Sequence, residues 1–486
     1  MTNTTQRGFK ALLLGSVLAA SPSFAQFDSG STGEDGSLSP LVDTTIQLPE
    51  DGILNYTTVT IPTGVTLRFE SNATNTPVVI LATGNVTIDG SIDVSGGNAT
   101  DAGVAGDGNL GDDGLPGIGG PGGFAGGAGG TITSPAGGNG LGPGGGQGGN
   151  ILGNSSFGLG CAGAGAGFES LGARGGGCNN DQSIGQVYGD ASLQPLIGGS
   201  GGGGGYAGTN FSGAGGGGGG GAILIASSET ITVNGAIRAN GGIPGDSGGP
   251  ASGGVGGEGS GGAIRLVASV LSGEGIIEAL DSSVSVNNNQ SNQTAGRGSD
   301  GRIRLEAQTI ERSSGTTPAF AFSGPEPVFL ANIPGVRIAS VAGIVTPASP
   351  SGAGDVVIPE TTPNPVVIEF TTNNVPVGNT IELTLTPQSG VSTTSVSGAI
   401  TGSDTAGTAS VSVEIPDGPS TLSASVTFTI AVASNGELVE DYSRFAKGNA
   451  VEKVRIDFDP EQGSMTTFIA KNGEEYSWPS NTIAFN

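Results

Sequence analysis

A long stretch in the first half of the chain is built mainly from glycine. Between Asp101 and Gly220 lie 50 of the 96 glycines, interleaved with alanine, serine, asparagine and proline. Glycine has no side chain to bury, and ordering its backbone in regular structure costs roughly 1 kcal/mol more than ordering alanine. This stretch therefore cannot form an ordinary hydrophobic core.

Two physical states suit such a stretch. A flexible glycine-rich coil of this length would span about 60 Å from end to end. Alternatively, its glycine runs could pack as polyproline-II-like helices, because only glycine lets such backbones approach closely. Isolated apolar side chains would then pin the assembly to the rest of the protein, namely Phe124, Ile151, Leu152, Phe157, Phe168, Tyr188 and Leu196. The sequence favours a partly ordered glycine-rich insertion.

A degenerate repeat flanks the glycine stretch. Its clearest copy is Gly221–Gly242 (GAILIASSETITVNGAIRANGG), and it recurs at Gly262–Ser282, at Pro77–Gly97 and partly at Gly301–Ile310. Each copy reads as three short alternating strands, too small to bury their apolar faces alone, followed by a glycine-rich loop. The pattern predicts stacked coils of a right-handed parallel β-helix, with all the loops leaving on one side.

These patterns divide the chain into successive regions. We predict a signal peptide over 1–25, a flexible segment over 26–40, and the β-helix over 41–322 with its glycine-rich insertion at 98–220. An Ig-like or fibronectin-like β-sandwich should follow over 323–435, and a small β-hairpin module over 436–486. The expected fold class is all-β, with no helix of consequence.

The sandwich prediction rests on strand candidates separated by turn signals. They recur every 10–15 residues and are rich in valine, threonine and isoleucine, a composition typical of β-sandwich strands. The candidates are Val336–Val341, Asp355–Ile358, Val366–Thr371, Thr380–Thr386, Val391–Val396, Ala409–Ile415 and Ala424–Val432, with Val454–Asp457, Met465–Ala470 and Tyr476–Trp478 in the last module.

The amino terminus indicates export. Arg7 and Lys10 precede the apolar run Ala11–Ala20, and small residues around Ala25 form a cleavage site, as in a secretory leader. No later stretch approaches the ~20 apolar residues that a spanning helix needs. The net charge of −26 opposes binding to nucleic acid or anionic membranes. We therefore expect a secreted or outer-surface protein with no membrane span and no nucleic-acid partner.

The composition also excludes several kinds of chemistry. The chain has no histidine, which rules out Ser-His-Asp and Cys-His catalytic sites and histidine-ligated zinc or haem. No lysine follows a glycine as a Walker A loop requires. Matches to G-x-G-x-x-G carry no information in a chain so rich in glycine.

Two cysteines, Cys161 and Cys178, lie within the glycine stretch. In an exported chain we expect them to form a disulfide, which would contribute roughly 3 kcal/mol by the chain-entropy estimate. A redox role is not expected, because the chain has no C-x-x-C spacing.

Asp101, Asp107, Asp112 and Asp113 lie in one glycine- and asparagine-containing loop. Oxygen ligands on a flexible backbone suit Ca²⁺, which takes six to eight of them. The nonapeptide array of calcium β-rolls is absent, however, and a solvated acidic turn is the alternative. Calcium is the one cofactor that the sequence suggests.

Other polar and aromatic residues have two interpretations each. Arg265, Arg302 and Arg304, with Glu278 and Glu306, could form ladders on the outer face of the coils or line a carbohydrate groove. Three aromatic residues flank the glycine runs and could stack on sugars or anchor the glycine-rich insertion: Tyr188, Tyr206 and Phe211.

The coils resemble a class of secreted, glycine-rich β-helix proteins of Gram-negative bacteria. The resemblance is carried by DGILNYTTVTIPTGVTLRFESNATNTPVVILATGNVTIDGSIDVSGG and by GGGGGGAILIASSETITVNGAIRANGG, and it covers Leu41–Ile310. Members look like cell-surface or extracellular-matrix proteins, so the resemblance implies a structural or adhesive role. It supplies no catalytic residues.

The expected function is therefore that of a non-enzymatic secreted or cell-surface protein, structural or adhesive, which binds through its glycine-rich loops. Its partner would be an extracellular polysaccharide or a cell-surface molecule, and self-association is a further expectation. The alternatives are a polysaccharide-active β-helix enzyme of the lyase or esterase type and a fibre-forming matrix subunit.

Overall fold

The structure is a computed structural model. It describes residues 27–103, 109–150, 161–178, 181–208, 211–246, 253–282, 287–288, 293–326, 328, 333–347, 354–430, 442–446, 449–459 and 463–480. The expected signal peptide over 1–25 lies outside the described residues. The described chain is all-β, and its helical parts are two 3-10 turns, η1 (Leu110–Asp112) and η2 (Ser443–Phe445).

The region before residue 326 contains two parallel sheets. The first has nine strands, with β1, β4, β7, β9, β11, β15 and β16 in that order and with β3 and β6 joined beside β9. They are β1 (Ser37–Leu38), β3 (Ile53–Tyr56), β4 (Thr58–Ile61), β6 (Val78–Ala82), β7 (Val86–Ile88), β9 (Ala222–Val233), β11 (Ala263–Ser272), β15 (Arg302–Ile310) and β16 (Ala321–Ser323).

The second sheet has five strands in the order β12-β10-β8-β5-β2. They are β2 (Thr44–Gln47), β5 (Thr66–Glu70), β8 (Ser91–Asp93), β10 (Ala236–Arg238) and β12 (Ile276–Glu278). Successive repeats contribute to both sheets in turn, so β6 and β7 in the first sheet are followed by β8 in the second. A short antiparallel pair, β13 (Asn287–Asn288) with β14 (Gln293–Thr294), stands apart.

Both sheets enclose one apolar core, which the alternation of the repeats creates. The parallel register places Ile80 beside Ile225, Ile225 beside Leu266, and Leu266 beside Leu305. All four side chains are fully buried. Ile92, Ile237 and Ile277 from the second sheet belong to the same core. Each copy therefore adds one layer to a continuous apolar stack. The three short strands expected per copy are separate only in β6, β7 and β8, because the first two are fused into one strand in β9 and in β11.

The outer face of the nine-stranded sheet is covered as well. Leu81, Leu224 and Val267 point away from the main core and pack with Phe27, and Leu196 and Val328 lie against them. Residues 26–40 were expected to be flexible. Instead Phe27 is buried and Ser37–Leu38 pairs with β4, because this segment covers apolar outward-facing side chains of the sheet.

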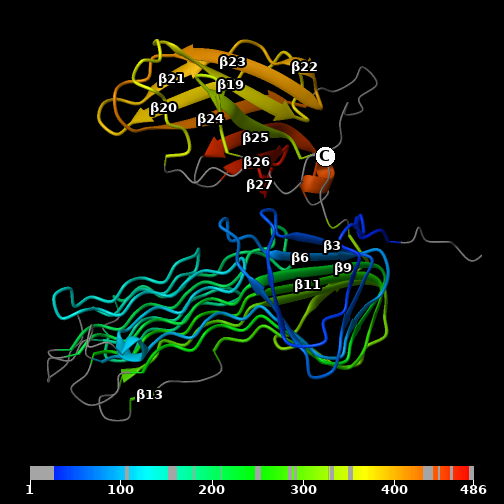
Figure 1. Ribbon diagram of the computed structural model, residues 1–486, viewed down its shortest axis with the longest axis vertical. Helices are drawn as coiled ribbons and strands as arrows, with labels where there is room; N and C mark the ends of the chain where they lie inside the picture. The colour runs from blue at the N-terminus through cyan, green and yellow to red at the C-terminus, as the bar shows by residue number, and fades with distance from the viewer. Residues whose placement is uncertain are drawn as a thin grey trace, which may run out of the picture.

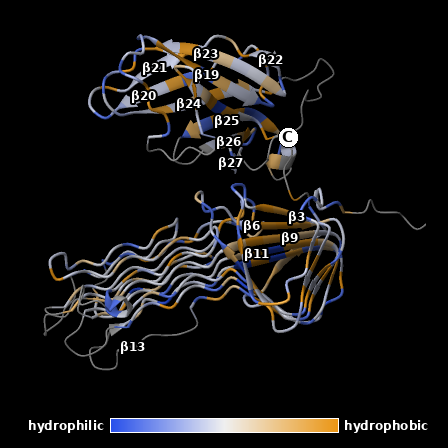
Figure 2. Cartoon of the chain, viewed as in Figure 1, coloured by the Kyte–Doolittle hydropathy of each residue, from blue (hydrophilic) through white to orange (hydrophobic). Residues whose placement is uncertain are grey.

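The glycine-rich segments leave the two sheets on one side and form a separate body (Figure 1). The expectation that the loops leave on the same side is therefore correct. Figure 2 shows the difference in composition, since the strands of the sheets are strongly hydrophobic and this body is close to neutral.

The region from residue 333 onward forms two antiparallel sheets. One has five strands in the order β18-β17-β19-β23-β22 and the other has six in the order β21-β20-β24-β25-β26-β27. They are β17 (Gly335–Val341), β18 (Ile344–Val345), β19 (Val366–Asn373), β20 (Glu382–Pro387), β21 (Thr393–Val396), β22 (Thr401–Ser403), β23 (Ala406–Val413), β24 (Ser420–Thr429), β25 (Val451–Asp459), β26 (Gly463–Ala470) and β27 (Glu475–Pro479).

Two sequence predictions fail in this region. The last three strands are not a separate hairpin module over 436–486, because β25 pairs with β24 and its Val454 and Ile456 lie in the common core. Asp355–Ile358 does not form a strand. The remaining strand candidates correspond to strands of the two sheets, with shifted ends.

Candidate functional site: the glycine arm

We call the body formed by residues 94–103, 109–150, 161–178, 181–208, 211–221, 239–246, 253–262 and 294–301 the glycine arm. Its segments run side by side but belong to no regular sheet over most of their length. They are held together by backbone hydrogen bonds between segments.

These hydrogen bonds repeat every third residue. From the segment 198–208, Gly199, Gly202 and Gly205 donate to Gly220, Gly217 and Ala214 of one neighbour at 2.7–2.9 Å. Gly201, Gly204 and Ala207 donate to a second neighbour, at Leu141, Gly138 and Pro135. A step of three residues is the turn of a polyproline-II helix, which has no internal hydrogen bonds. The described segments are therefore ordered in the second of the two states expected from the sequence.

The segment 198–208 has six neighbours. It donates most of its N–H groups to three of them and accepts hydrogen bonds from the other three, the exceptions being Gly198 and Ser200, whose N–H groups donate to Gly122 O and Ser260 Oγ. The neighbours are 122–131, 135–142, 144–150, 161–168, 211–221 and 253–262. The segment 211–221 is surrounded in the same way by 94–103, 114–121, 122–131, 198–208, 239–246 and 253–262. This is hexagonal packing of backbones.

Hexagonal packing explains why the inner segments need glycine. A Cβ atom added at Gly204 would lie 2.0 Å from the carbonyl oxygen of Ala128, and one at Gly202 would lie 2.2 Å from that of Gly257. Real Cβ contacts are never so short. The core of the arm is thus backbone packed on backbone, with almost no apolar side chains.

One edge of the arm carries a ladder of polar side chains. Ser95 Oγ accepts from the N–H of Asn240 at 3.1 Å, and Asn98 Oδ1 accepts from that of Ile243 at 3.0 Å. Asp101 Oδ1 accepts from the N–H of Asp246 at 2.8 Å. The three acceptors are three residues apart, so they lie on one face of the helix and cap outward-facing N–H groups of its neighbour.

The structure assigns Asp101 to this ladder. Asp112 lies in η1, where its Oδ1 is buried without a hydrogen-bond partner among the described residues, and Asp113 pairs with Ala102 as an isolated bridge. Asp107 lies outside the described residues. No three acidic or cysteine side chains of the described chain are close enough together to hold a metal ion. Calcium binding stays a prediction.

Cys161 and Cys178 form the expected disulfide. It links two neighbouring segments of the arm, which also bond at Ala162 N–H to Gly176 O, 3.0 Å apart. Cys161 is fully buried against the inner segment 198–208, where its carbonyl accepts from the N–H of Tyr206 at 3.2 Å. The disulfide therefore fastens a backbone lattice that has few side-chain contacts.

Two of the three aromatic residues are packed within the arm. The ring of Tyr188 lies 4.5 Å from that of Phe168, and its hydroxyl donates to Gly198 O at 2.6 Å. Burial raises the pKa of this hydroxyl. Tyr206 is buried within the arm and Phe211 is partly buried. For the two tyrosines, these contacts and the burial of Tyr206 agree with anchoring, the first choice from the sequence, and sugar stacking stays a prediction.

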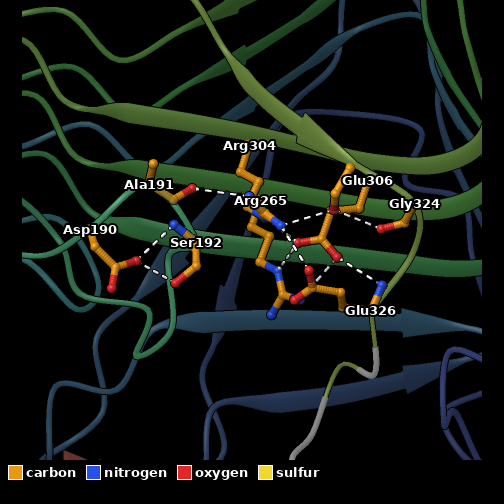
Figure 3. A network of polar contacts seen from close by, with 9 residues as sticks. Asp190, Ala191, Ser192, Arg265, Arg304, Glu306, Gly324 and Glu326 are labelled. Atoms are coloured by element: carbon orange, nitrogen blue, oxygen red, sulfur yellow. Dashed lines mark hydrogen bonds and ion pairs between the residues drawn. The ribbon is translucent and has the colours of Figure 1, made fainter. Parts of the chain in front are cut away.

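A buried charge network lies where the arm meets the nine-stranded sheet (Figure 3). Arg265 Nε and Arg304 Nε donate to the same oxygen of Glu306, Oε1, at 2.8 and 2.6 Å. Arg304 Nη2 also donates to Glu326 Oε1 at 3.1 Å. Arg265 and Arg304 are 2 % and 8 % exposed and Glu306 is fully buried.

The burial of these side chains was not expected from the sequence. The side chains lie on the outer face, as expected, but residues 188–197 of the arm and residues 323–326 cover them. The carbonyl of Ala191 accepts from Arg304, and the amide oxygen of Gln194, in its alternative orientation, accepts from Arg265 at 2.7 and 2.9 Å. Glu278 is not part of the network and pairs with Arg238. A carbohydrate groove at Arg265 and Arg304 is therefore excluded, while the half-buried Arg302 donates from Nη2 to Tyr188 O at 3.4 Å.

A second buried carboxylate lies inside the arm. Glu258 is 2 % exposed, and its Oε2 accepts from the N–H of Gly298 at 3.2 Å. Burial, aided by the nearby charge of Asp281, raises the pKa of Glu258 to about 7, while Gly298, Ser282 and Arg297 oppose the shift. Asp281 itself accepts from Arg297 at 2.7 Å.

Glu258 should make the arm less stable above neutral pH. Because the pKa of Glu258 is higher in the folded than in the unfolded state, its contribution to stability is fully present below the unfolded-state pKa near 4.5. This contribution is lost as the pH rises through the folded-state pKa of about 7. We expect Glu258→Gln to stabilise the arm at pH 8 by on the order of 2 kcal/mol and to have little effect at pH 5. Amide hydrogen exchange of the arm at both pH values measures this, and equal effects at the two values would contradict it.

Two hollows lie on the C-terminal sheets. The larger, about 490 Å³, is lined by residues such as Glu369, Thr371, Thr408 and Ser410 from β19 and β23. Serine, threonine and a single carboxylate give no acid–base pair there.

The chain matches no known family, and it has no significant similarity to a curated protein or to a solved structure.

Proposed function

We propose that this chain is a non-enzymatic binding protein of the cell surface or the extracellular space, and that the glycine arm is the part that presents the binding surface. The observation that carries the proposal is the hexagonal backbone lattice. Its inner segments exclude even a Cβ atom, so the arm is stiff although it has hardly any apolar core. A stiff lattice holds many segments at fixed positions relative to one another, in a body that extends away from the sheets (Figure 1).

The architecture that we propose follows the sequence patterns. The two parallel sheets and their shared core are the coils of a right-handed parallel β-helix, and the two C-terminal antiparallel sheets form an Ig-like sandwich that acts as a spacer or docking module. This arrangement supports presentation, because the coils give each glycine segment a fixed point of departure.

An extracellular location is part of the proposal. The leader-like amino terminus, the disulfide between Cys161 and Cys178 and the net charge of −26 are its support. No helix in the described part of the chain is long and apolar enough to cross a membrane. The partner class that we propose is an extracellular polysaccharide or a cell-surface molecule.

A binding screen tests the proposal. The full chain is applied to immobilised neutral and anionic polysaccharides and to intact cells, beside Gly204→Ala, which we expect to disrupt the arm, and Gly315→Ala, whose Cβ would meet nothing within 4 Å. We expect at least one ligand to be bound by the full chain and by Gly315→Ala, and about tenfold more weakly by Gly204→Ala.

Two results would overturn the proposal. The first is release of sugar from a polysaccharide, which would identify an enzyme of the lyase or esterase type. The second is unchanged binding by Gly204→Ala when hydrogen exchange shows that its arm is disrupted, because the binding surface would then lie elsewhere.

A further inference from the structure

One layer of the glycine arm forms an open, uncharged face. It consists of the neighbouring segments 114–121, 122–131 and 135–142, which we call the neutral face. Gly126 N–H donates to Gly117 O at 2.9 Å, and Leu141 N–H donates to Ala125 O at 2.9 Å, so the three segments lie side by side. This layer covers the inner segments 198–208 and 211–221 on one side only.

Charge sets this face apart from the rest of the molecule. No Asp, Glu, Lys or Arg occurs from Gly114 to Phe168, in a chain with a net charge of −26. Two copies of such an acidic protein repel each other over most of their surfaces. The neutral face is where this repulsion is weakest.

The neutral face also has uncapped hydrogen-bonding groups. The N–H groups of Ile118, Ala125, Ala128 and Asn139 donate to no described residue. On the other edge of the arm, by contrast, Ser95, Asn98 and Asp101 cap such groups of the neighbouring segment. One edge is thus closed by side chains and the other is left open, as on an unprotected edge strand of a sheet.

Aliphatic side chains are exposed on the same layer. Leu115, Ile118 and Leu141 are 44 %, 75 % and 57 % exposed. Covering them would remove apolar surface from water at about 25 cal/mol per Å². No backbone hydrogen bond joins the described residues up to 326 with those from 333 onward.

The spacing of the open N–H groups selects the partner. Ala125 and Ala128 are one turn apart, about 9 Å along a polyproline-II helix. A β-strand offers hydrogen-bonding groups along one edge about every 7 Å, so its carbonyl groups cannot face successive N–H groups that are about 9 Å apart. The backbone whose carbonyl spacing matches these N–H groups is another helix with three residues per turn. The glycine-rich segments of a second copy of this chain are such helices.

We infer that the neutral face docks against the same face of a second copy of this chain, forming a homodimer in which the hexagonal lattice continues across the interface. This inference does not rest on the proposed function, since either could hold without the other. Each copy would place Ile118 and Leu115 against its partner, and the acidic surfaces would remain outside.

Sedimentation velocity of the full chain from about 1 to 100 μM tests the inference. We expect the sedimentation coefficient to rise with concentration, and more steeply in 0.5 M than in 0.05 M salt, because salt screens the acidic surfaces. Ile118→Asp with Ala128→Asp should raise the dimer dissociation constant at least tenfold. Leu41→Asp, at a side chain 86 % exposed outside the arm, should behave like the unchanged chain.

Amide hydrogen exchange of the unchanged chain gives a second readout that does not depend on how the variants fold. We expect the amides of Ile118, Ala125 and Ala128 to become better protected as the concentration rises. A chain that stays monomeric throughout, a doubly substituted variant that dimerises like the unchanged chain, or protection of these amides independent of concentration would overturn the inference. The last result would indicate closure by the molecule's own C-terminal sheets.

Discussion

Replacing Gly204 by alanine should unfold the glycine arm. Its Cβ would lie 2.0 Å from the carbonyl oxygen and 2.5 Å from the carbonyl carbon of Ala128, both backbone atoms. Gly204 also donates to Gly138 O at 2.9 Å and accepts from the N–H of Gly149 at 2.8 Å, so it cannot move away without breaking bonds on two sides.

We expect this change to cost more than about 3 kcal/mol, the upper end for overpacking in cores, because every neighbour is backbone and no side chain can change rotamer. Amide hydrogen exchange resolved by region is the suitable measurement, since sheets and arm need not unfold together. The amides of 122–131, 198–208 and 211–221 should lose protection, while those of the C-terminal sheets should keep theirs.

Gly315→Ala is the matched control. Gly315 has open space where its Cβ would be, so this change should alter stability by less than about 0.5 kcal/mol. Full protection of the arm in Gly204→Ala would show that the segments are not in hexagonal contact in solution. Gly204 would then be replaceable like any loop glycine.

The sheets could be predicted from the sequence, because alternation directly reports burial. Ile223, Ile264 and Ile303 recur at equivalent points of the repeat and stand in register on neighbouring strands. The disulfide could also be predicted, since the chain offers only one pair of cysteines. The strands follow from a local pattern, and the disulfide follows from the number of cysteines.

The order within the glycine arm could be expected only as one of two states. A run of glycines is compatible with a flexible coil and with packed helices, because glycine itself has no side chain that could show a period. The sparse side chains do contain the missing signal. Ser95, Asn98 and Asp101 recur at every third position and form one ladder, and Leu115 and Ile118 repeat that step on the neutral face.

The buried charge network could not be predicted, because its cover is distant in sequence. Arg304 bonds to Ala191 across 113 residues, from a part of the chain with no strand pattern. From alternation alone, Arg265 and Arg304 belong on a solvated outer face. Burial of that face depends on where the arm returns to the sheet, which no local pattern specifies.

Replacing Glu306 by glutamine should destabilise the junction between the sheet and the arm by about 3–5 kcal/mol, the cost of breaking a buried ion pair from one side. The parallel register places Arg265 directly beside Arg304 on the next strand. These like charges are held together by Glu306, whose Oε1 accepts from both, and glutamine would leave the two buried guanidinium groups without a shared counter-ion.

The exposed ion pair of Arg455 with Asp457 provides the control. Its atoms are 3.0 Å apart, but the side chains are 40 % and 48 % exposed, so Asp457→Asn should cost no more than about 1 kcal/mol. Protection of the β11 and β15 amides should fall in Glu306→Gln and stay unchanged in Asp457→Asn. Equal protection in both would mean that water reaches Glu306 and that the network is not buried in solution.

A triple replacement separates charge from packing at this junction. Arg265→Met with Arg304→Met and Glu306→Leu removes all three charges and keeps much of their volume, and such changes in other buried ion networks are often neutral or stabilising. We therefore expect the triple variant to retain most of the protection that Glu306→Gln loses. If it loses as much, the hydrogen bonds to Ala191 and Glu326 hold the cover in place. The network would then determine where the arm attaches to the sheet, beyond balancing its own charges.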